Sequence, residues 1–214
     1  MGFERSGKIS VVCIGLLLAA SFSFSDFLID DFNDGNNKNE LESYWYFYND
    51  EVPGGNSVVE NDPFEDYGVE DGAAVMEFSL GDSVDKDDYI LYPFVGMGFN
   101  FDGADGKTNF DLTGADALKF RAKGDQKFVV KLVVETSNVT DDNKLHHKFE
   151  VTETWREVTV LLEKDDDLGL TQENWGSSSP KKDYDPTKVQ KLAFQVRGNE
   201  NKKLKRGKLY IDDL

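Results

Sequence analysis

Apolar and polar residues alternate along most of this chain with the two-residue period of a β-strand. The run 127–135 shows the pattern clearly: every second residue from Phe128 to Val134 is apolar, whereas Lys131 and Glu135 lie on the opposite face. Clusters of Gly, Asn, Asp and Ser separate such runs. We therefore predict strands at 27–32, 44–48, 57–61, 73–80, 89–101, 117–124, 127–135, 147–152, 156–163, 191–198 and 209–214.

Most of these strands are predicted to bury one face only. A hydrated face opposite a buried face is typical of antiparallel sheets that pack in pairs. No long segment has a convincing helical period. The pattern therefore favours an all-β fold, an antiparallel two-sheet sandwich. The run 164–187 is the longest irregular stretch, and its length suggests a binding loop.

The N-terminal residues differ from the rest of the chain. Arg5 and Lys8 precede an apolar run at 9–22, and the small residues Ser23 and Ser25 suit cleavage before position 26. The run is shorter than the ~20 apolar residues of a membrane-spanning helix. We therefore expect a signal peptide at 1–25, a single domain at 26–214 and a secreted, periplasmic or cell-surface location, with no membrane contact after cleavage.

Composition narrows the range of partners. The formal net charge of −17 argues against nucleic acid and anionic membranes, and it suits neutral ligands or divalent cations. The single cysteine, Cys13, lies within the predicted signal peptide, so the domain is expected to have no disulfide. Its stability must then come from its core, with a bound metal as additional support.

Catalytic motifs are incomplete in this sequence. The GDS motif at 81–83 follows a predicted strand, as in a group of secreted esterases, but a serine nucleophile needs a histidine oriented by a carboxylate. His146 and His147 are the two histidines, and position 143, three residues before the first, is Asn143 instead of aspartate. A glycosidase needs two carboxylates on facing strands, and a chain this rich in acids does not single out a pair. We therefore expect no catalytic activity.

Residues 44–48, with the sequence YWYFY, form the most aromatic stretch of the chain. On a strand, Tyr44, Tyr46 and Tyr48 share one face at intervals of ~6.6 Å, and Trp45 and Phe47 point into the sandwich. A tyrosine ring covers the apolar face of a sugar while its hydroxyl reaches the polar edge. The stretch therefore indicates carbohydrate binding. Packing of the same tyrosines beneath long loops is the alternative.

Several motifs, taken in order, resemble those of known families: LIDDFNDG, YWYFYND, YPFVGMGFNF, DLTGADALKFRAKG, TETWREVTVLLE, TQENWG, VQKLAFQVRG and LYIDDL. Across residues 27–214 this series resembles the family 11 and family 30 carbohydrate-binding modules, and it is similar to the complex I intermediate-associated protein family. The resemblance implies a galactose-binding-like jelly-roll β-sandwich with its first and last strands side by side. It also implies a groove that binds β-glucan without cleaving it, and a structural calcium ion near the chain ends.

The resemblance and the strand pattern together give a set of candidate sugar-binding residues. Two tyrosines would stack on sugar rings, an arginine and a glutamine would hydrogen-bond to hydroxyl groups, and two further aromatics would wall the groove. The set is Tyr46, Tyr48, Tyr92, Arg121, Trp175 and Gln195. The expected ligand is a polysaccharide of the β-glucan type, with a separate glycoside hydrolase or a surface protein as a further partner.

Two other functions remain open at this point. A cell-surface or scaffold protein could use the outer face of the same sandwich against another protein. A jelly-roll polysaccharide hydrolase or lyase would instead release reducing sugar or unsaturated product. The sequence does not select the polysaccharide, because specificity depends on groove width and on hydrogen bonds to the sugar edges.

A calcium site is predicted where the two chain ends meet. Asp31 and Asp34 flank the first turn, and the jelly roll should bring Asp212 on the last strand beside them. Calcium suits this set because the available ligands are oxygens, including the amide of Asn33 and backbone carbonyls. The alternative is an acidic turn that holds no ion and is exposed to water.

Overall fold

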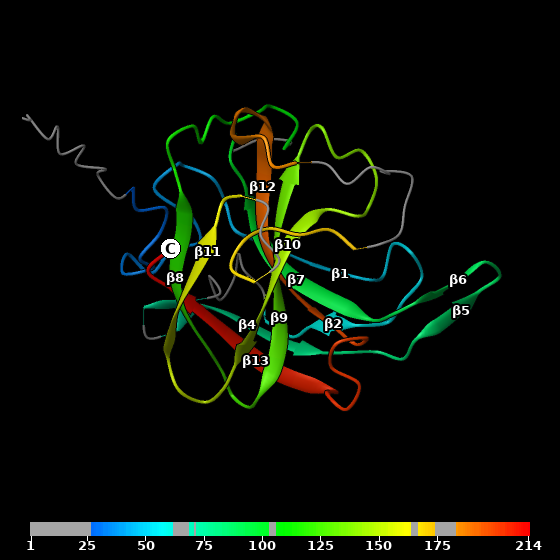
Figure 1. The fold of residues 1–214 in the computed structure, drawn as a ribbon. Helices are drawn as coiled ribbons and strands as arrows, with labels where there is room; N and C mark the ends of the chain where they lie inside the picture. Colours follow the sequence, from blue (N-terminus) through cyan, green and yellow to red (C-terminus); the bar gives the residue numbers. More distant parts are fainter. Residues whose placement is uncertain (1–26, 62–68, 71, 103–105, 164–166, 174–182) are drawn as a thin grey trace, which may run out of the picture.

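The computed structural model describes residues 27–61, 69–70, 72–102, 106–163, 167–173 and 183–214. The predicted signal peptide lies outside these residues. Figure 1 shows two β-sheets packed face to face, with the connecting loops at the two ends of the sandwich. The predicted all-β fold, an antiparallel jelly-roll sandwich, is confirmed. Among the described residues, no helix is long and apolar enough to span a membrane.

The first sheet has five antiparallel strands, and it forms one layer of the sandwich. Their spatial order is β1 (Tyr46–Asn49), β7 (Phe94–Asn100), β12 (Val189–Arg197), β9 (Phe128–Thr136) and β10 (Leu145–Val151). A short 3₁₀ helix, η1 (Pro186–Lys188), leads directly into β12. Because strands distant in sequence are neighbours in this sheet, its outer face combines side chains from the whole chain.

The second sheet forms the other layer. Its spatial order is β11 (Arg156–Leu161), β8 (Ala117–Gly124), β13 (Arg206–Asp212), β4 (Ala73–Ser79) and β2 (Val58–Val59), and β3 (Val69–Glu70) also pairs with β4. A separate two-stranded hairpin consists of β5 (Val84–Lys86) and β6 (Tyr89–Leu91).

The core lies between the two layers and is rich in phenylalanine. Phe120 from β8 meets Phe194 from β12 edge to face, with 5.0 Å between the ring centroids. Trp45 packs in the same manner on Phe99, also at 5.0 Å. The alternating residues in 127–135 bury the face that the pattern predicted, because the apolar side chains at every second position from Phe128 to Val134 belong to the buried core cluster.

The first described segment lies beside the C-terminal residue Leu214, but this segment is not a regular strand. Ile29 N donates to Leu214 O at 2.7 Å, and Leu214 N donates to Asp30 O at 3.0 Å. The buried Asp30 carboxylate accepts from Phe32 N at 2.8 Å and from Trp45 Nε1 at 2.7 Å. These bonds turn the chain at Phe32, where φ is 52°, so the strand predicted at 27–32 was wrong.

The strand predicted at 89–101 is divided in two. β6 ends at Leu91 and β7 begins at Phe94, with Tyr92 and Pro93 between them. Proline has no backbone N–H to donate to a neighbouring strand, which explains the break. The Pro93 carbonyl accepts a bond from Gly198 N at 2.8 Å, so this junction lies beside the turn that follows β12.

Candidate functional site

The outer face of the five-stranded sheet contains a row of side chains that crosses all five strands. Tyr48 on β1 pairs with Gly96 on β7, which pairs with Gln195 on β12. Gln195 pairs in turn with Lys131 on β9, and Lys131 pairs with Lys148 on β10. Residues directly opposite one another in adjacent strands project from the same face. The row therefore begins with an aromatic ring and ends with two cations.

The aromatic part of this face is the tyrosine stripe, which we define as Tyr46, Tyr48 and Phe94. The two tyrosine centroids are 6.1 Å apart, and those of Tyr48 and Phe94 are 6.3 Å apart. A Cβ atom at position 96 would overlap the Tyr48 ring, so that ring lies across the glycine. All three stripe side chains are half-buried. The rings thus form a partly exposed surface supported by the sheet.

The tyrosine hydroxyls remain protonated at neutral pH. Burial raises the pKa of Tyr46 and of Tyr48 above the ordinary value of 10.0. A hydrogen bond between the Tyr48 and Gln195 side chains opposes this rise in part. The stripe therefore offers hydroxyl groups that both donate and accept hydrogen bonds, next to an amide with the same capacity.

Arg197 lies at the end of the tyrosine stripe. Its guanidinium carbon is 5.8 Å from the centroid of the Phe94 ring. The buried Nε atom of Arg197 has no hydrogen-bond acceptor among the described residues. A buried donor without a partner is costly, so this arginine is held with one hydrogen-bonding group unsatisfied within the described part of the chain.

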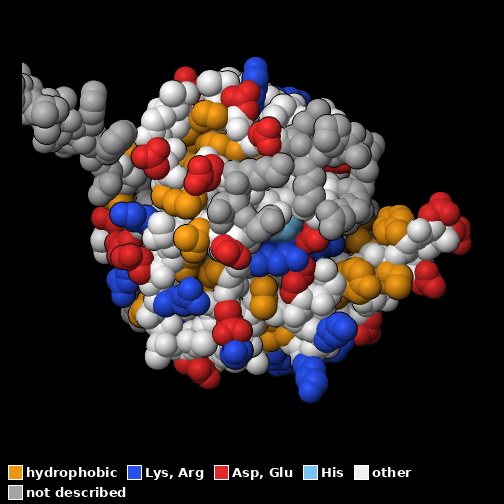
Figure 2. Space-filling view, viewed as in Figure 1, with side chains coloured by type: hydrophobic (Ala, Val, Ile, Leu, Met, Phe, Trp, Pro, Cys, Tyr) orange, Lys and Arg blue, Asp and Glu red, His pale blue; other side chains and the backbone are white. Residues whose placement is uncertain are grey.

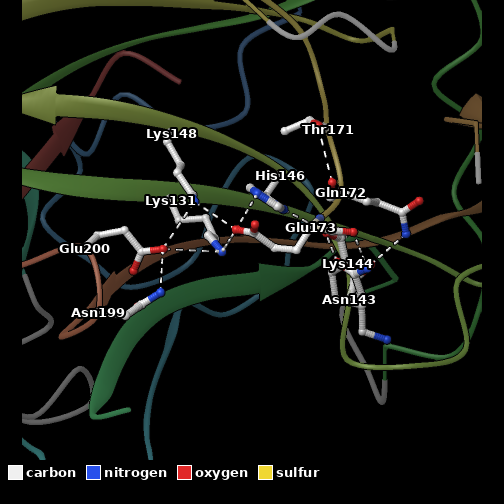
Figure 3. A network of polar contacts seen from close by, with 10 residues as sticks. All are labelled: Lys131, Asn143, Lys144, His146, Lys148, Thr171, Gln172, Glu173, Asn199 and Glu200. Atoms are coloured by element: carbon white, nitrogen blue, oxygen red, sulfur yellow. Dashed lines mark hydrogen bonds and ion pairs between the residues drawn. The ribbon is translucent and has the colours of Figure 1, made fainter. Parts of the chain in front are cut away.

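The opposite edge of the same face carries an ion network, defined here as Lys131, His146, Lys148, Glu173 and Glu200 (Figure 3). Lys148 Nζ lies 2.8 Å from Glu173 Oε1 and 3.3 Å from Glu200 Oε1. Lys131 Nζ lies 3.4 Å from Glu173 Oε1 and 3.9 Å from Glu200 Oε1. Two lysines thus share two glutamates, and the charges balance.

Burial and pairing control how this network titrates. Lys131 is only 7% exposed, and burial lowers its pKa. Burial would raise the pKa of Glu173, but the hydrogen bond from Lys148 and the charge of Lys131 together lower it to about 2. Burial and the charge of Lys131 lower the pKa of His146 to about 4, so the imidazole is neutral at pH 7.

The segment that contains Glu173 is fixed to the sheet edge. His146 and Thr171 exchange backbone hydrogen bonds, with N–O distances of 2.9 and 2.8 Å. The Asn143 side chain holds Glu173 through both backbone groups, accepting from its N and donating to its O at 2.9 Å each. The described part of the predicted loop at 164–187 is therefore ordered against β10 at this point.

The structure brings together only some of the predicted sugar-binding residues. Tyr46, Tyr48 and Gln195 lie on the outer face of the five-stranded sheet, and exposed Tyr92 directly follows β6, two residues before Phe94. Trp175 falls outside the described residues. The sequence reasoning did not identify Arg197, although it lies two positions after Gln195 on the same strand face, and that spacing could have indicated it.

Arg121 does not lie on the same face as the other predicted sugar-binding residues, which corrects the predicted set. It lies on β8, in the other sheet, where its Nη1 is 3.1 Å from Asp212 Oδ2 and 3.4 Å from Asp213 Oδ2. Its guanidinium carbon is also 5.0 Å from the centroid of Trp155. Arg121 points outward from its strand, but the two sheets of a sandwich have outward faces on opposite sides. Arg121 and Gln195 cannot contact one ligand.

The predicted metal ligands are partly engaged with the protein itself. Asp34 Oδ1 accepts from Asn36 N, and Asp31 Oδ1 accepts from Asn33 N, each at 3.1 Å. Burial and the charge of Asp213 raise the pKa of Asp212, with a smaller effect from Asp31. Asp31 and Asp212 thus lie within electrostatic reach of each other. Within the described ranges, no group of three or more His, Cys, Asp or Glu side chains is arranged to hold a metal.

Comparison with known proteins gives a family match and a curated relative. The sequence model of the Complex I intermediate-associated protein 30 (CIA30) family matches residues 31–208. Endoglucanase 3 of Fibrobacter succinogenes is 28% identical over 191 residues, which are 87% of this chain and 26% of that enzyme. The chain therefore spans about a quarter of the length of this relative.

Solved structures with the same fold include two family 11 carbohydrate-binding modules from Clostridium thermocellum. One, in complex with a β-1,3-1,4-mixed-linked tetrasaccharide, has a TM-score of 0.50 at 15% identity, covering 87% of this chain and 91% of that one. The other, from a cellulosomal cellulase, has a TM-score of 0.52 at 15% identity, covering 88% and 92%. At this identity the similarity establishes the shared fold.

Proposed function

Because the chain belongs to the Complex I intermediate-associated protein 30 family and folds as a jelly-roll sandwich, we propose that it is a carbohydrate-binding domain that binds without cleavage. Its ligand is a neutral polysaccharide of the β-glucan type. The binding surface is the outer face of the five-stranded sheet. The endoglucanase relative and the mixed-linkage tetrasaccharide bound to one structural neighbour support this ligand class.

The tyrosine stripe beside Gln195 is the observation that carries the proposal. Sugar rings have apolar C–H faces that pack on aromatic rings, and polar edges that need hydrogen-bond partners. Tyr46 and Tyr48 supply ring surface and protonated hydroxyls, and Gln195 adds an amide beside them. The stripe follows the direction of β1, so a linear chain of sugars fits it better than a compact ligand.

The state of the nearby carboxylates supports binding without hydrolysis. A glycosidase requires a carboxylic acid that is still protonated near neutral pH, together with a second free carboxylate. Glu173 has a pKa lowered to about 2, which is the wrong direction for a general acid. Glu200 is held by Lys148 at 3.3 Å. Neither glutamate is suited to cleave a polymer bound across the sheet.

Affinity electrophoresis against a panel of soluble polysaccharides tests the proposal. The panel contains mixed-linkage β-glucan, hydroxyethylcellulose, galactomannan and a polyuronate. We expect a β-glucan to retard the domain, and Tyr48→Ala to weaken that binding roughly tenfold or more. Tyr210→Ala is the matched control, because Tyr210 is a half-buried tyrosine on the other sheet. Retardation by no β-glucan in the panel would overturn the proposal.

Export and partnership are further parts of the proposal. The predicted cleavage after Ser25 places the domain outside the cytoplasm, beside a glycoside hydrolase that acts on the same polymer. The quarter of an endoglucanase that the chain matches supports such a partnership. N-terminal sequencing of the exported protein is expected to begin at Asp26, and an intact Met1 on that protein would contradict it.

We also propose that calcium binds near the chain ends. The ligands would be drawn from Asp31, Asp34 and Asp212, with backbone oxygens beside them. The electrostatic coupling of Asp31 with Asp212 supports this location, since a cation there would relieve the repulsion between two carboxylates.

A further inference from the structure

The β5–β6 hairpin forms an arm that extends away from the sandwich (Figure 1). Its register places Val84 opposite Leu91, Asp85 opposite Ile90 and Lys86 opposite Tyr89. Within the described structure, these two strands pair only with each other. A two-stranded hairpin is marginally stable in water by itself. The arm is therefore not an extension of either sheet.

The arm exposes large hydrophobic side chains. Tyr89 is 57% exposed, Ile90 is 52% exposed, and Tyr92, at the base of the arm, is 38% exposed. Figure 2 shows hydrophobic side chains along this projection and acidic side chains at its tip, where the sequence has Asp87 and Asp88. Tyr89 and Ile90 are neighbours on a strand and so face opposite sides of the arm, which means that each side of this projecting element exposes a large hydrophobic side chain.

The arm is continuous with the tyrosine stripe. Two residues join its last strand to Phe94, the stripe residue that lies 6.3 Å from Tyr48. Arg197 lies over the Phe94 ring at the same place, and the neighbouring Gly198 N donates to Pro93 O at 2.8 Å. A ligand that follows the stripe past Phe94 therefore arrives at Tyr92 and the arm.

We propose that the β5–β6 arm is a second contact for the polysaccharide, reached only by chains that extend beyond the tyrosine stripe. The inference rests on the proposed function and adds a preference for long chains. Tyr89 and Tyr92 provide the same combination of ring and hydroxyl as the stripe. The aspartates at the tip disfavour an anionic polymer or an anionic membrane as the occupant, which leaves a neutral chain.

Calorimetric titration with a mixed-linkage tetrasaccharide and with the corresponding long polymer tests the arm. The variant is Tyr89→Ser combined with Ile90→Ser, measured beside each single substitution. We expect affinity per site for the polymer to fall about five- to tenfold, and affinity for the tetrasaccharide to stay unchanged. Val52→Ser is the matched control, because Val52 is 98% exposed outside the arm, and it should change neither affinity.

The outcomes separate this inference from the proposed function. Tyr48→Ala should weaken binding of both ligands, because the stripe serves chains of any length. If the parent binds β-glucan and the arm variant binds the polymer equally well, the arm inference is overturned and the proposed function stands. If the parent sediments as a dimer and the arm variant as a monomer with unchanged polymer affinity, the arm contacts a second copy of this chain. The arm inference is then likewise overturned. If the parent binds no β-glucan, both proposals fall.

Discussion

The ring of Tyr48 lies across Gly96 on the neighbouring strand, in space that a Cβ atom at position 96 would occupy. We therefore predict that Gly96→Ala displaces the ring and weakens β-glucan binding about tenfold, although position 96 need not contact the sugar. Calorimetry measures the change. In a Tyr48→Ala background the same substitution should have little further effect, because its effect is transmitted through that ring. Additive losses would show that Gly96 acts independently.

His146 should make the stability of the domain sensitive to acid. Burial lowers its pKa from 6.5 to about 4, so between these values the unfolded chain binds a proton that the folded state does not. The stabilising contribution is complete above pH 6.5 and is lost as the pH falls to 4, amounting to about 2–3 kcal/mol. His146→Gln, which keeps a side-chain donor for the Lys144 carbonyl, should remove this dependence in urea unfolding between pH 7 and 4.

The free energy of unfolding of His146→Gln must be compared with that of the parent at each pH, because Asp30 affects the pH dependence of stability in the opposite sense. Burial raises the pKa of Asp30 to about 6 from 3.8, so its contribution to stability is present at low pH and is lost as the pH rises through 6. Asp30→Asn should change the profile in the direction opposite to His146→Gln. Parallel pH profiles for the parent and His146→Gln would contradict a buried neutral imidazole.

Arg121 should contribute to stability and leave sugar binding unchanged. It pairs with Asp212 at 3.1 Å on the outer face of the other sheet, and the arginine is nearly half exposed. Exposed ion pairs of this kind contribute up to about 1 kcal/mol. Arg121→Ala is therefore expected to lower the melting temperature by a few degrees with unchanged β-glucan affinity. Gln195→Ala should instead weaken β-glucan binding and leave the melting temperature unchanged. Loss of β-glucan binding in the Arg121→Ala variant would contradict the assignment of the binding face.

Calcium should raise the melting temperature if it binds near Asp31 and Asp212. An ion that binds only the folded state stabilises it by about 2.7 kcal/mol at a hundredfold excess over its dissociation constant. Scanning calorimetry with chelator, with millimolar calcium and with magnesium measures this effect. The double variant Asp31→Asn, Asp212→Asn should lose the response to calcium. Identical melting temperatures for the parent in chelator and in calcium would rule out the site.

The hydrophobic pattern predicted an all-β two-sheet sandwich, the family resemblance predicted the jelly roll, and the two together predicted one half of the candidate site. Tyr46, Tyr48 and Gln195 could be assigned to outward faces because side chains on a strand alternate. The same rule misplaced Arg121, since alternation gives the face of a strand and not the sheet to which the strand belongs. Sheet membership is decided by long-range pairing, which no local pattern encodes.

The contacts of the ion network could be predicted from the sequence even less than sheet membership. Lys131 and Glu173 are 42 positions apart, and their contact depends on Asn143 fixing a segment against the edge of β10. In a chain with 41 acidic residues, no local signal singles out the carboxylate that will meet a buried lysine. The burial of that lysine also could not be read from its place on the polar side of an amphipathic strand.

The balance of charge in the ion network has a consequence for how the sheet responds to ionic strength. Lys131 and Lys148 are already neutralised by Glu173 and Glu200, so this edge of the face offers little unpaired positive charge to an ionic ligand. Binding that depends on ion release weakens steeply as salt increases, whereas stacking of uncharged sugars on aromatic rings does not. Affinity measured in dilute buffer should therefore persist in brackish water or concentrated salt, where proteins that rely on unpaired cations lose their ligands.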